Sequence, residues 1–144
     1  MDFGTYIDRL AALDFRQIAV ECMKSNEPIL WRANIDQLIH GIKSTGKPIG
    51  KYRNDAYAAK KNRMNPEAGL GNVDLLFKRD FSRGIFFRFT ADSIISDSNE
   101  KHYDGSMDLL EAYGDDVLGI LMTEKVKFDL QPEFIAIVKN KIAL

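Results

Sequence analysis

Residues 44 to 81 read STGKPIGKYRNDAYAAKKNRMNPEAGLGNVDLLFKRDF. The stretch begins as a basic segment punctuated by glycine and proline, and it ends in an alternating apolar pattern that predicts a β-strand. Between Lys43 and Arg63 the chain carries seven basic residues and one acidic residue, whereas residues 92 to 144 carry five basic and eleven acidic residues. A chain with a net charge of −1 therefore contains two oppositely charged regions. Such regions suit a protein that docks against copies of itself or against a charged assembly.

The bulk composition fits a single folded domain. The chain has 144 residues, of which 45% are hydrophobic and 28% are charged, so it can build one core. Its apolar runs are short, so we expect no transmembrane helix, and the acidic start MDFGTYID does not resemble a signal peptide. Cys22 is the only cysteine. A single cysteine excludes an intrachain disulfide and a zinc site built from thiolates. It favours a protein that functions or assembles inside a cell over a secreted one.

Helical spacing of apolar residues predicts helices at both ends of the chain. Thr5 is the expected cap of the first helix, and Pro28 suits the first turn of the second. The expected helices cover residues 6–23, from 28 to a stop at Gly46, 106–113, 115–122 and 132–142.

Alternating apolar residues predict two strands, at residues 73–78 and 84–96, joined by a turn at 79–82. In the second strand Ile85, Phe87 and Phe89 share the inward face. Phe86 falls on the opposite face, where it meets either the N-terminal helix or a partner. Together these elements predict one α+β domain over residues 1–144, in which N-terminal and C-terminal helices pack on a small antiparallel β-sheet.

We expect residues 43–72 to form an extended basic arm on this domain, fully ordered only against a neighbour. A short helix from Asp55 to Arg63 would interrupt the arm, because that stretch is rich in helix formers. Long loops in compact domains usually have a function. The predicted partner-binding residues are Lys47, Lys51, Tyr52, Arg53, Tyr57, Lys60, Lys61 and Arg63 in the arm, with Lys78 and Arg79 beyond it.

No catalytic or ligand-binding motif in the sequence competes with the interpretation of these residues as a partner-binding arm. The segment Thr45–Tyr52 fails the Walker pattern, because three residues rather than four separate its glycines. The segment Asp97–His102 begins like a calcium loop, but Lys101 stands at a ligand position. Neither histidine has a metal-ligand neighbour, and Cys22 lies among apolar residues. We therefore expect no catalytic residue, metal, cofactor or small-molecule substrate.

Five segments resemble small virion proteins of tailed bacteriophages, in the group of head–tail connector, tail-completion and minor tail proteins. The segments are GIKSTGKPIGKY (41–52), YAAKK (57–61), NPEAG (65–69), VDLLFKRDF (73–81) and YGDDVLG (113–119). The resemblance covers residues 31 to 128. In that group the first strand leads into a Leu-Thr-Gly-Asp-Phe-like turn, whereas Lys78 and Arg79 stand here in place of the Thr and Gly. These two differences add positive charge to the turn and remove its glycine, the residue with the greatest backbone freedom.

The resemblance implies a non-enzymatic structural role in the virion, which is assembled in the host cytoplasm. Several copies would form a ring in the neck or tail, next to portal, connector or tail proteins, close to packaged DNA and away from any membrane. A ring subunit presents different surfaces to its two neighbours, which opposite charges suit. One alternative is a small nucleic-acid-binding accessory protein that uses residues 43–63, with bases stacked on Tyr52 and Tyr57. An enzyme with an unrecognised site is a second alternative.

Overall fold

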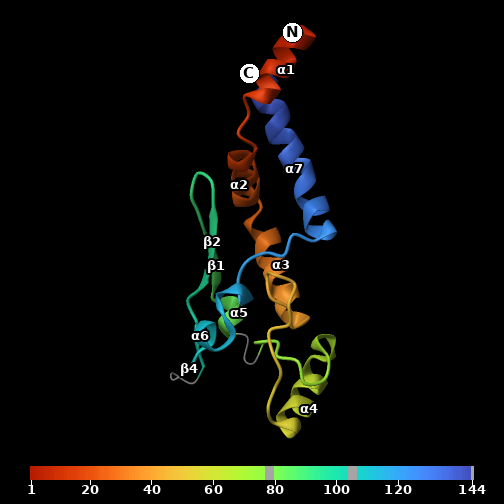
Figure 1. Cartoon of the computed structure of the whole chain (residues 1–144), viewed down its shortest axis with the longest axis vertical. Coiled ribbons are helices and arrows are strands. Elements are labelled where there is room, and N and C mark those ends of the chain that lie inside the picture. The colour runs from red at the N-terminus through yellow and green to blue at the C-terminus, as the bar shows by residue number, and fades with distance from the viewer. Residues whose placement is uncertain (77–79, 104–106, 144) are drawn as a thin grey trace. The chain divides into compact units, whose positions relative to one another are not determined.

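The computed structural model of the chain describes residues 1–76, 80–103 and 107–143. The fold is α+β, as predicted, with helices at both ends of the chain and antiparallel strand pairing in its middle (Figure 1). The chain packs as two units. Unit 1 contains residues 1–29, 88–94 and 122–144, and unit 2 contains residues 30–87 and 95–121.

The helices and strands follow one another along the chain. In order they are α1 (Phe3–Ala11), α2 (Phe15–Ser25), α3 (Glu27–Ile39), α4 (Asp55–Met64), η1 (Pro66–Ala68), α5 (Asp80–Arg83), β1 (Ile85–Phe89), β2 (Ile94–Ser98), β3 (His102–Tyr103), β4 (Met107–Asp108), α6 (Leu109–Tyr113), η2 (Asp115–Val117) and α7 (Glu124–Ala143).

The N-terminal helical region consists of two helices, where one continuous helix was predicted. Asp2, rather than Thr5, caps α1, because its carboxylate accepts a hydrogen bond from the Thr5 backbone N–H at 3.0 Å. Asp14 caps α2 by accepting from the backbone amides of Arg16 and Gln17, both at 3.1 Å. An aspartate that binds its own following amides favours a helix start over a helix interior. The predicted single helix is therefore wrong at Asp14.

The C-terminal helix α7 begins eight residues before its predicted start at Pro132, which lies inside the helix. Proline lacks the N–H that would bond to the residue four positions earlier, so it normally ends a helix. Here the buried side chains of Val126, Leu130 and Ile137 on both sides of the proline supply the tertiary packing that stabilises the helix. The α2 and α7 helices contact each other, and the rings of Phe15 and Phe134 stack with centroids 6.4 Å apart.

Two buried amide side chains of α3 bind a segment more than 80 residues later in the sequence. Asn34 donates to the carbonyl of Val117 at 3.3 Å and accepts from the Gly119 N–H at 3.2 Å. Gln37 donates to the Gly119 carbonyl at 3.0 Å and accepts from the Leu121 N–H at 2.7 Å. These four bonds satisfy backbone groups that no strand partner serves, and they fix the segment on α3.

The chain reverses after α3 at Gly41, before the predicted stop at Gly46. Gly41 has φ +67°, a conformation that favours glycine. A Cβ atom there would lie 2.9 Å from the Val73 carbonyl oxygen. The absence of a side chain thus lets this turn approach the segment that precedes α5.

The predicted strands are partly redistributed. Residues 73–76 form no strand, and the rest of the predicted first strand lies outside the described residues. The expected turn contains the short helix α5, and the long second strand is a hairpin of β1 and β2. Thr90 and Ser93 close that hairpin through a backbone hydrogen bond of 2.9 Å. Ile85 and Phe87 are buried, as predicted for the inward face, whereas Phe89, which was predicted on the same face, is only half-buried, as is Phe86.

The segment after the hairpin is compact and follows the predicted helix and turn only in part. The strands β3 and β4 pair in antiparallel fashion. The α6 helix is shorter than predicted and stops at Gly114, which has φ +94°. The η2 turn then takes the place of the short helical turn that was expected there.

Candidate functional site

A buried carboxylate, Asp74, organises the basic segment. It is 1% exposed and lies 2.7 Å from the Lys61 ammonium. The Asn65 side chain donates to Asp74 Oδ2 at 2.9 Å, and the Leu76 N–H donates at 3.1 Å to Oδ1, the oxygen that pairs with Lys61. The Tyr52 hydroxyl lies 3.4 Å away. A buried charge is tolerated when it is paired and hydrogen-bonded, so these four donors make Asp74 an internal anchor.

Lys61 therefore has a different role from the predicted one. Its side chain is buried, at 4% exposure, and its ammonium is committed to Asp74. A lysine in this position is inaccessible to a partner protein. We assign it to the scaffold of α4 rather than to the partner-binding surface.

Residues 43–72 are folded against their own chain, whereas an extended arm was expected. Backbone bridges join Ile42 to Pro48 and Lys51 to Asn72. The predicted short helix is present as α4, and Asn54 caps it by accepting from the Tyr57 N–H at 2.9 Å. Buried apolar residues in this segment contribute to the core of unit 2. The arm is thus a structured part of the domain.

Five of the predicted partner-binding cations are exposed on this structured segment. We call this set of exposed cations on residues 43–72 the cationic face, and its members are Lys47, Lys51, Arg53, Lys60 and Arg63. Across residues 1–76, 80–103 and 107–143, no acidic side chain forms an ion pair with any of the five. Lys43 differs, because it pairs with Asp116 at 3.0 Å. Of the six predicted partner-binding cations between Lys47 and Arg63, five are therefore on the surface and one, Lys61, is buried.

The two tyrosines of the segment contact each other. The rings of Tyr52 and Tyr57 meet edge to face, with centroids 5.0 Å apart. Burial, together with the nearby charge of Asp74, raises the pKa of Tyr52 well above its ordinary value. Tyr52 is therefore part of the anchor around Asp74, and its hydroxyl is not presented to a ligand.

This pKa shift predicts a loss of stability in alkaline solution. The folded protein holds the Tyr52 proton more tightly than the unfolded chain, in which the pKa of tyrosine is about 10. The contribution is therefore complete below pH 10, and it is lost as the pH rises further, by at most about 1.4 kcal/mol per pH unit. We expect Tyr52→Phe to weaken this dependence in urea unfolding at pH 8, 10 and 11. Tyr6→Phe, at an exposed position, is the control, and equal losses in both variants would contradict the assignment.

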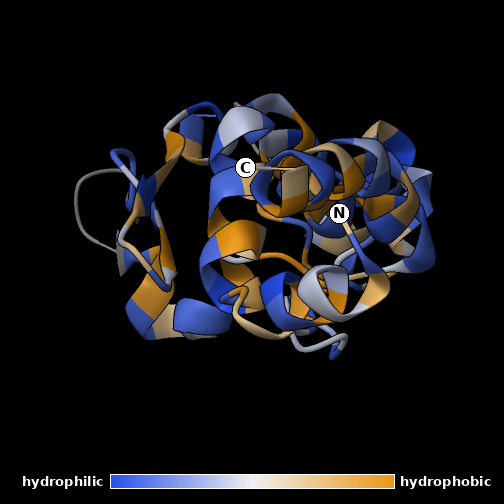
Figure 2. Cartoon of the chain, turned by 90° about the horizontal axis from the view of Figure 1, so that it is seen from above, coloured by the Kyte–Doolittle hydropathy of each residue, from blue (hydrophilic) through white to orange (hydrophobic). Residues whose placement is uncertain are grey.

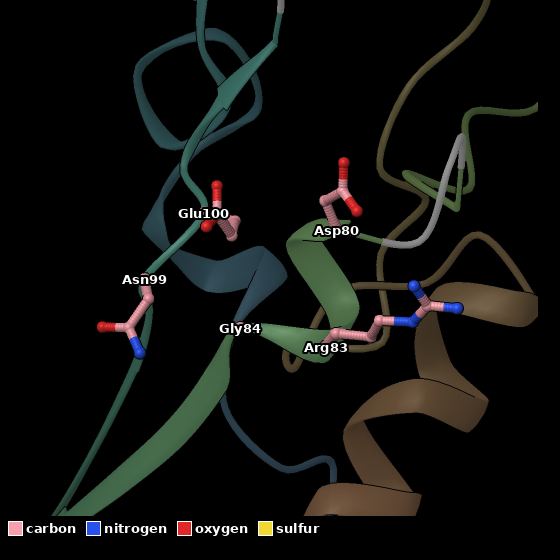
Figure 3. Close-up of a pocket in the computed structure, with 5 residues that line it drawn as sticks. All are labelled: Asp80, Arg83, Gly84, Asn99 and Glu100. Carbon is pink, nitrogen blue, oxygen red and sulfur yellow. The ribbon is translucent and has the colours of Figure 1, made fainter.

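Lys78 and Arg79, the remaining predicted site residues, lie outside the described residues. Close to the start of α5 there is an open polar pocket of about 480 Å³. Figure 3 shows Asp80 and Glu100 with their carboxylates on the same side, whereas Arg83 extends away from both. All three side chains belong to exposed residues, so the pocket is an acidic surface hollow.

Sequence patterns did not identify the residues that hold the cationic face in place. Asp74 lies in a predicted strand, and Asn65 lies in a predicted loop, where neither carries a recognisable motif.

Among the described residues, no group of three or more His, Cys, Asp or Glu side chains is placed to hold a metal ion. No helix within those residues has the length and apolar character needed to cross a membrane. In comparisons with known proteins, no family model, curated protein or solved structure matches this chain.

Proposed function

We propose that this protein is a non-enzymatic structural subunit of a tailed-bacteriophage virion, which forms a ring with copies of itself in the neck or tail. The ring would adjoin portal, connector or tail proteins, close to packaged DNA. The resemblance of residues 31–128 to small neck and tail proteins supports the virion setting. The observation that carries the assembly role is the cationic face, whose five exposed charges have no ion-pair partner among the described residues.

The same chain offers an acidic counterpart for that face. Its exposed acids in unit 2 include Asp80, Glu100, Glu111 and Asp115. Oppositely charged surfaces steer encounter and set the orientation of partners. A contact between the cationic face of one copy and the acidic residues of the next is head-to-tail, which closes into a ring when the rotation allows it.

The cationic face is also pre-organised. The Asp74 anchor and the cap at Asn54 hold α4 in place before any partner arrives. Charges on a rigid scaffold lose less conformational freedom on binding than charges on a mobile loop. This supports a fixed docking surface, where the sequence predicted a mobile arm.

The nucleic-acid alternative uses the same cations. Its stacking component is weakened because Tyr52 packs against Tyr57 and its hydroxyl lies against Asp74. Binding would then depend mainly on phosphate contacts, which weaken steeply as salt is raised. The experiment that tests assembly should therefore also measure DNA binding.

Reversing the charge of the cationic face is expected to block assembly while the chain stays folded. The variant carries Lys47→Glu, Lys51→Glu, Arg53→Glu, Lys60→Glu and Arg63→Glu, and it keeps the buried Lys61. Sedimentation and native mass spectrometry should show the wild-type chain as an oligomer and the variant at the monomer mass of 16.4 kDa. Detection of the chain in purified tailed particles tests the virion setting.

A matched control reverses five exposed cations elsewhere, at Arg16, Lys24, Arg32, Lys125 and Lys139. The control should assemble like the wild type. Normal assembly of the cationic-face variant would contradict the proposal. A monomeric wild-type chain that binds DNA with a steep salt dependence, lost in the variant, would instead support the nucleic-acid alternative.

A further inference from the structure

The N-terminal helix α1 has an uncovered apolar face. Phe3, Tyr6, Ile7 and Leu10 follow the i, i+3, i+4, i+7 spacing that places side chains on one side of a helix. Phe3 is 79% exposed, Tyr6 and Ile7 are each 43% exposed, and no residue of α1 is buried. A helix of nine residues is marginal in water without packing. The exposed face of α1 is therefore suited to contact with another surface.

A mostly apolar groove lies between α2 and α7 in the same unit. It has a volume of about 380 Å³, and its lining residues are Ala19, Cys22, Met23, Met122, Lys127, Leu130, Gln131 and Phe134. Methionine side chains adapt to irregular partners, and such grooves receive amphipathic helices. The helices at the chain ends carry both hydrophobic and hydrophilic residues (Figure 2).

Within unit 1, α1 lies at the C-terminal end of α7, whereas the groove runs along the first half of that helix as far as Phe134. Arg9 donates to the carbonyl of Ile142 at 2.9 Å, which fixes α1 at the C-terminal end of α7. The groove is lined by residues from Met122, just before α7 begins, to Phe134. Ile142 and Phe134, the groove residue nearest to it along α7, are separated by roughly 12 Å along a helix that rises 1.5 Å per residue. Figure 1 shows α1 beside the C-terminal end of α7. While the Arg9 bond holds α1 at that end, α1 does not reach the groove of its own chain.

We propose that α1 of one copy docks into the α2–α7 groove of the next copy. The inference rests on the proposed ring and specifies one of its contacts. Phe3 and Ile7 are the central anchors of a helix-in-groove contact. Donor and acceptor are different surfaces, so each copy donates one helix and receives another, as a closed ring requires.

The size of the contact explains why it needs the ring. At their observed exposure, Phe3 and Tyr6 offer roughly 250 Å² of aromatic surface, compared with roughly 800 Å² per partner in a stable interface. The groove contact alone is therefore small. It adds to the contact of the cationic face, and every subunit of a ring makes it twice.

Cross-linking between two separately purified proteins tests the contact. Both proteins carry Cys22→Ala, so that the native thiol is absent. One also carries Phe3→Cys, and the other carries Gln131→Cys. After mixing and mild oxidation, we expect a disulfide-linked heterodimer of twice the monomer mass on a non-reducing gel, because the two thiols meet only across an α1–groove contact.

The control replaces Phe3→Cys by Asp8→Cys, which lies on the opposite side of α1, and it should abolish the heterodimer. Equal cross-linking from both positions would overturn the inference. Ile7→Glu changes an exposed position and should reduce the oligomer to the monomer mass. If Ile7→Glu and the wild type assemble equally and no heterodimer forms, the inference fails while the ring stands. A wild-type chain that stays monomeric overturns both.

Discussion

Lys61→Met should destabilise the protein by about 3–5 kcal/mol, the usual cost of removing one partner of a buried ion pair. The side chains of Lys61 and Asp74 are 4% and 1% exposed, and their charged atoms lie 2.7 Å apart. Methionine preserves the apolar stem of the lysine but leaves the Asp74 charge without its cation. The remaining donors around Asp74 are neutral. The free energy of unfolding, from urea or guanidinium titration at pH 7, measures the effect.

Two further variants separate the ion pair from general damage to α4. Lys60→Met, at the neighbouring exposed position, should change stability by no more than about 0.5 kcal/mol. Lys61→Met combined with Asp74→Asn removes both charges, and it should recover much of the lost stability. A Lys61→Met protein within about 1 kcal/mol of the wild type would contradict the role of the pair, given the usual range for such buried pairs.

Asn34→Leu is expected to destabilise unit 2 by about 2–6 kcal/mol, since it leaves two backbone groups without a partner at about 1–3 kcal/mol each. The groups are the buried Val117 carbonyl and the part-buried Gly119 N–H, and Asn34 itself is fully buried. Leucine has the same number of side-chain heavy atoms as asparagine, but it can make neither hydrogen bond. Equilibrium unfolding gives the free energy, and hydrogen exchange at the Gly119 amide gives the local consequence.

The expected local signature is faster exchange at Gly119, while the amides of α4 retain their protection. Arg32→Gln, on the exposed side of α3, should leave both the free energy of unfolding and the exchange rates close to wild type. Unchanged exchange at Gly119 in Asn34→Leu would show that the amide of Asn34 does not hold this segment.

Apolar spacing identified most helices correctly in kind, but local competition decided their limits. The start of α3 next to Pro28 and the extent of α4 follow from residue preferences that act within a few positions. The break at Asp14 was missed because a periodic pattern continues across it, and only the cap hydrogen bonds reveal it. At Pro132 the local signal misled in the opposite direction. Proline normally ends a helix, but the packing of buried side chains on both sides of Pro132 keeps α7 continuous.

The candidate site was predictable in its charge and unpredictable in its geometry. A run of basic residues is visible in any sequence, and five members of this run are indeed on the surface. The burial of Lys61 depends on Asp74, thirteen residues later, and on no spacing rule. The amides of Asn34 and Gln37 likewise find partners more than 80 residues away. Such pairings arise from tertiary packing, which local patterns do not encode.

Gly41 sets a limit on how this protein can be re-engineered. Its φ of +67° and the 2.9 Å that would separate a Cβ from the Val73 oxygen leave room for hydrogen alone. The lysines and arginines of the cationic face meet no such restriction, because their side chains project into solvent. A designer could thus rewrite the specificity of the surface residue by residue, provided that position 41 is kept as glycine.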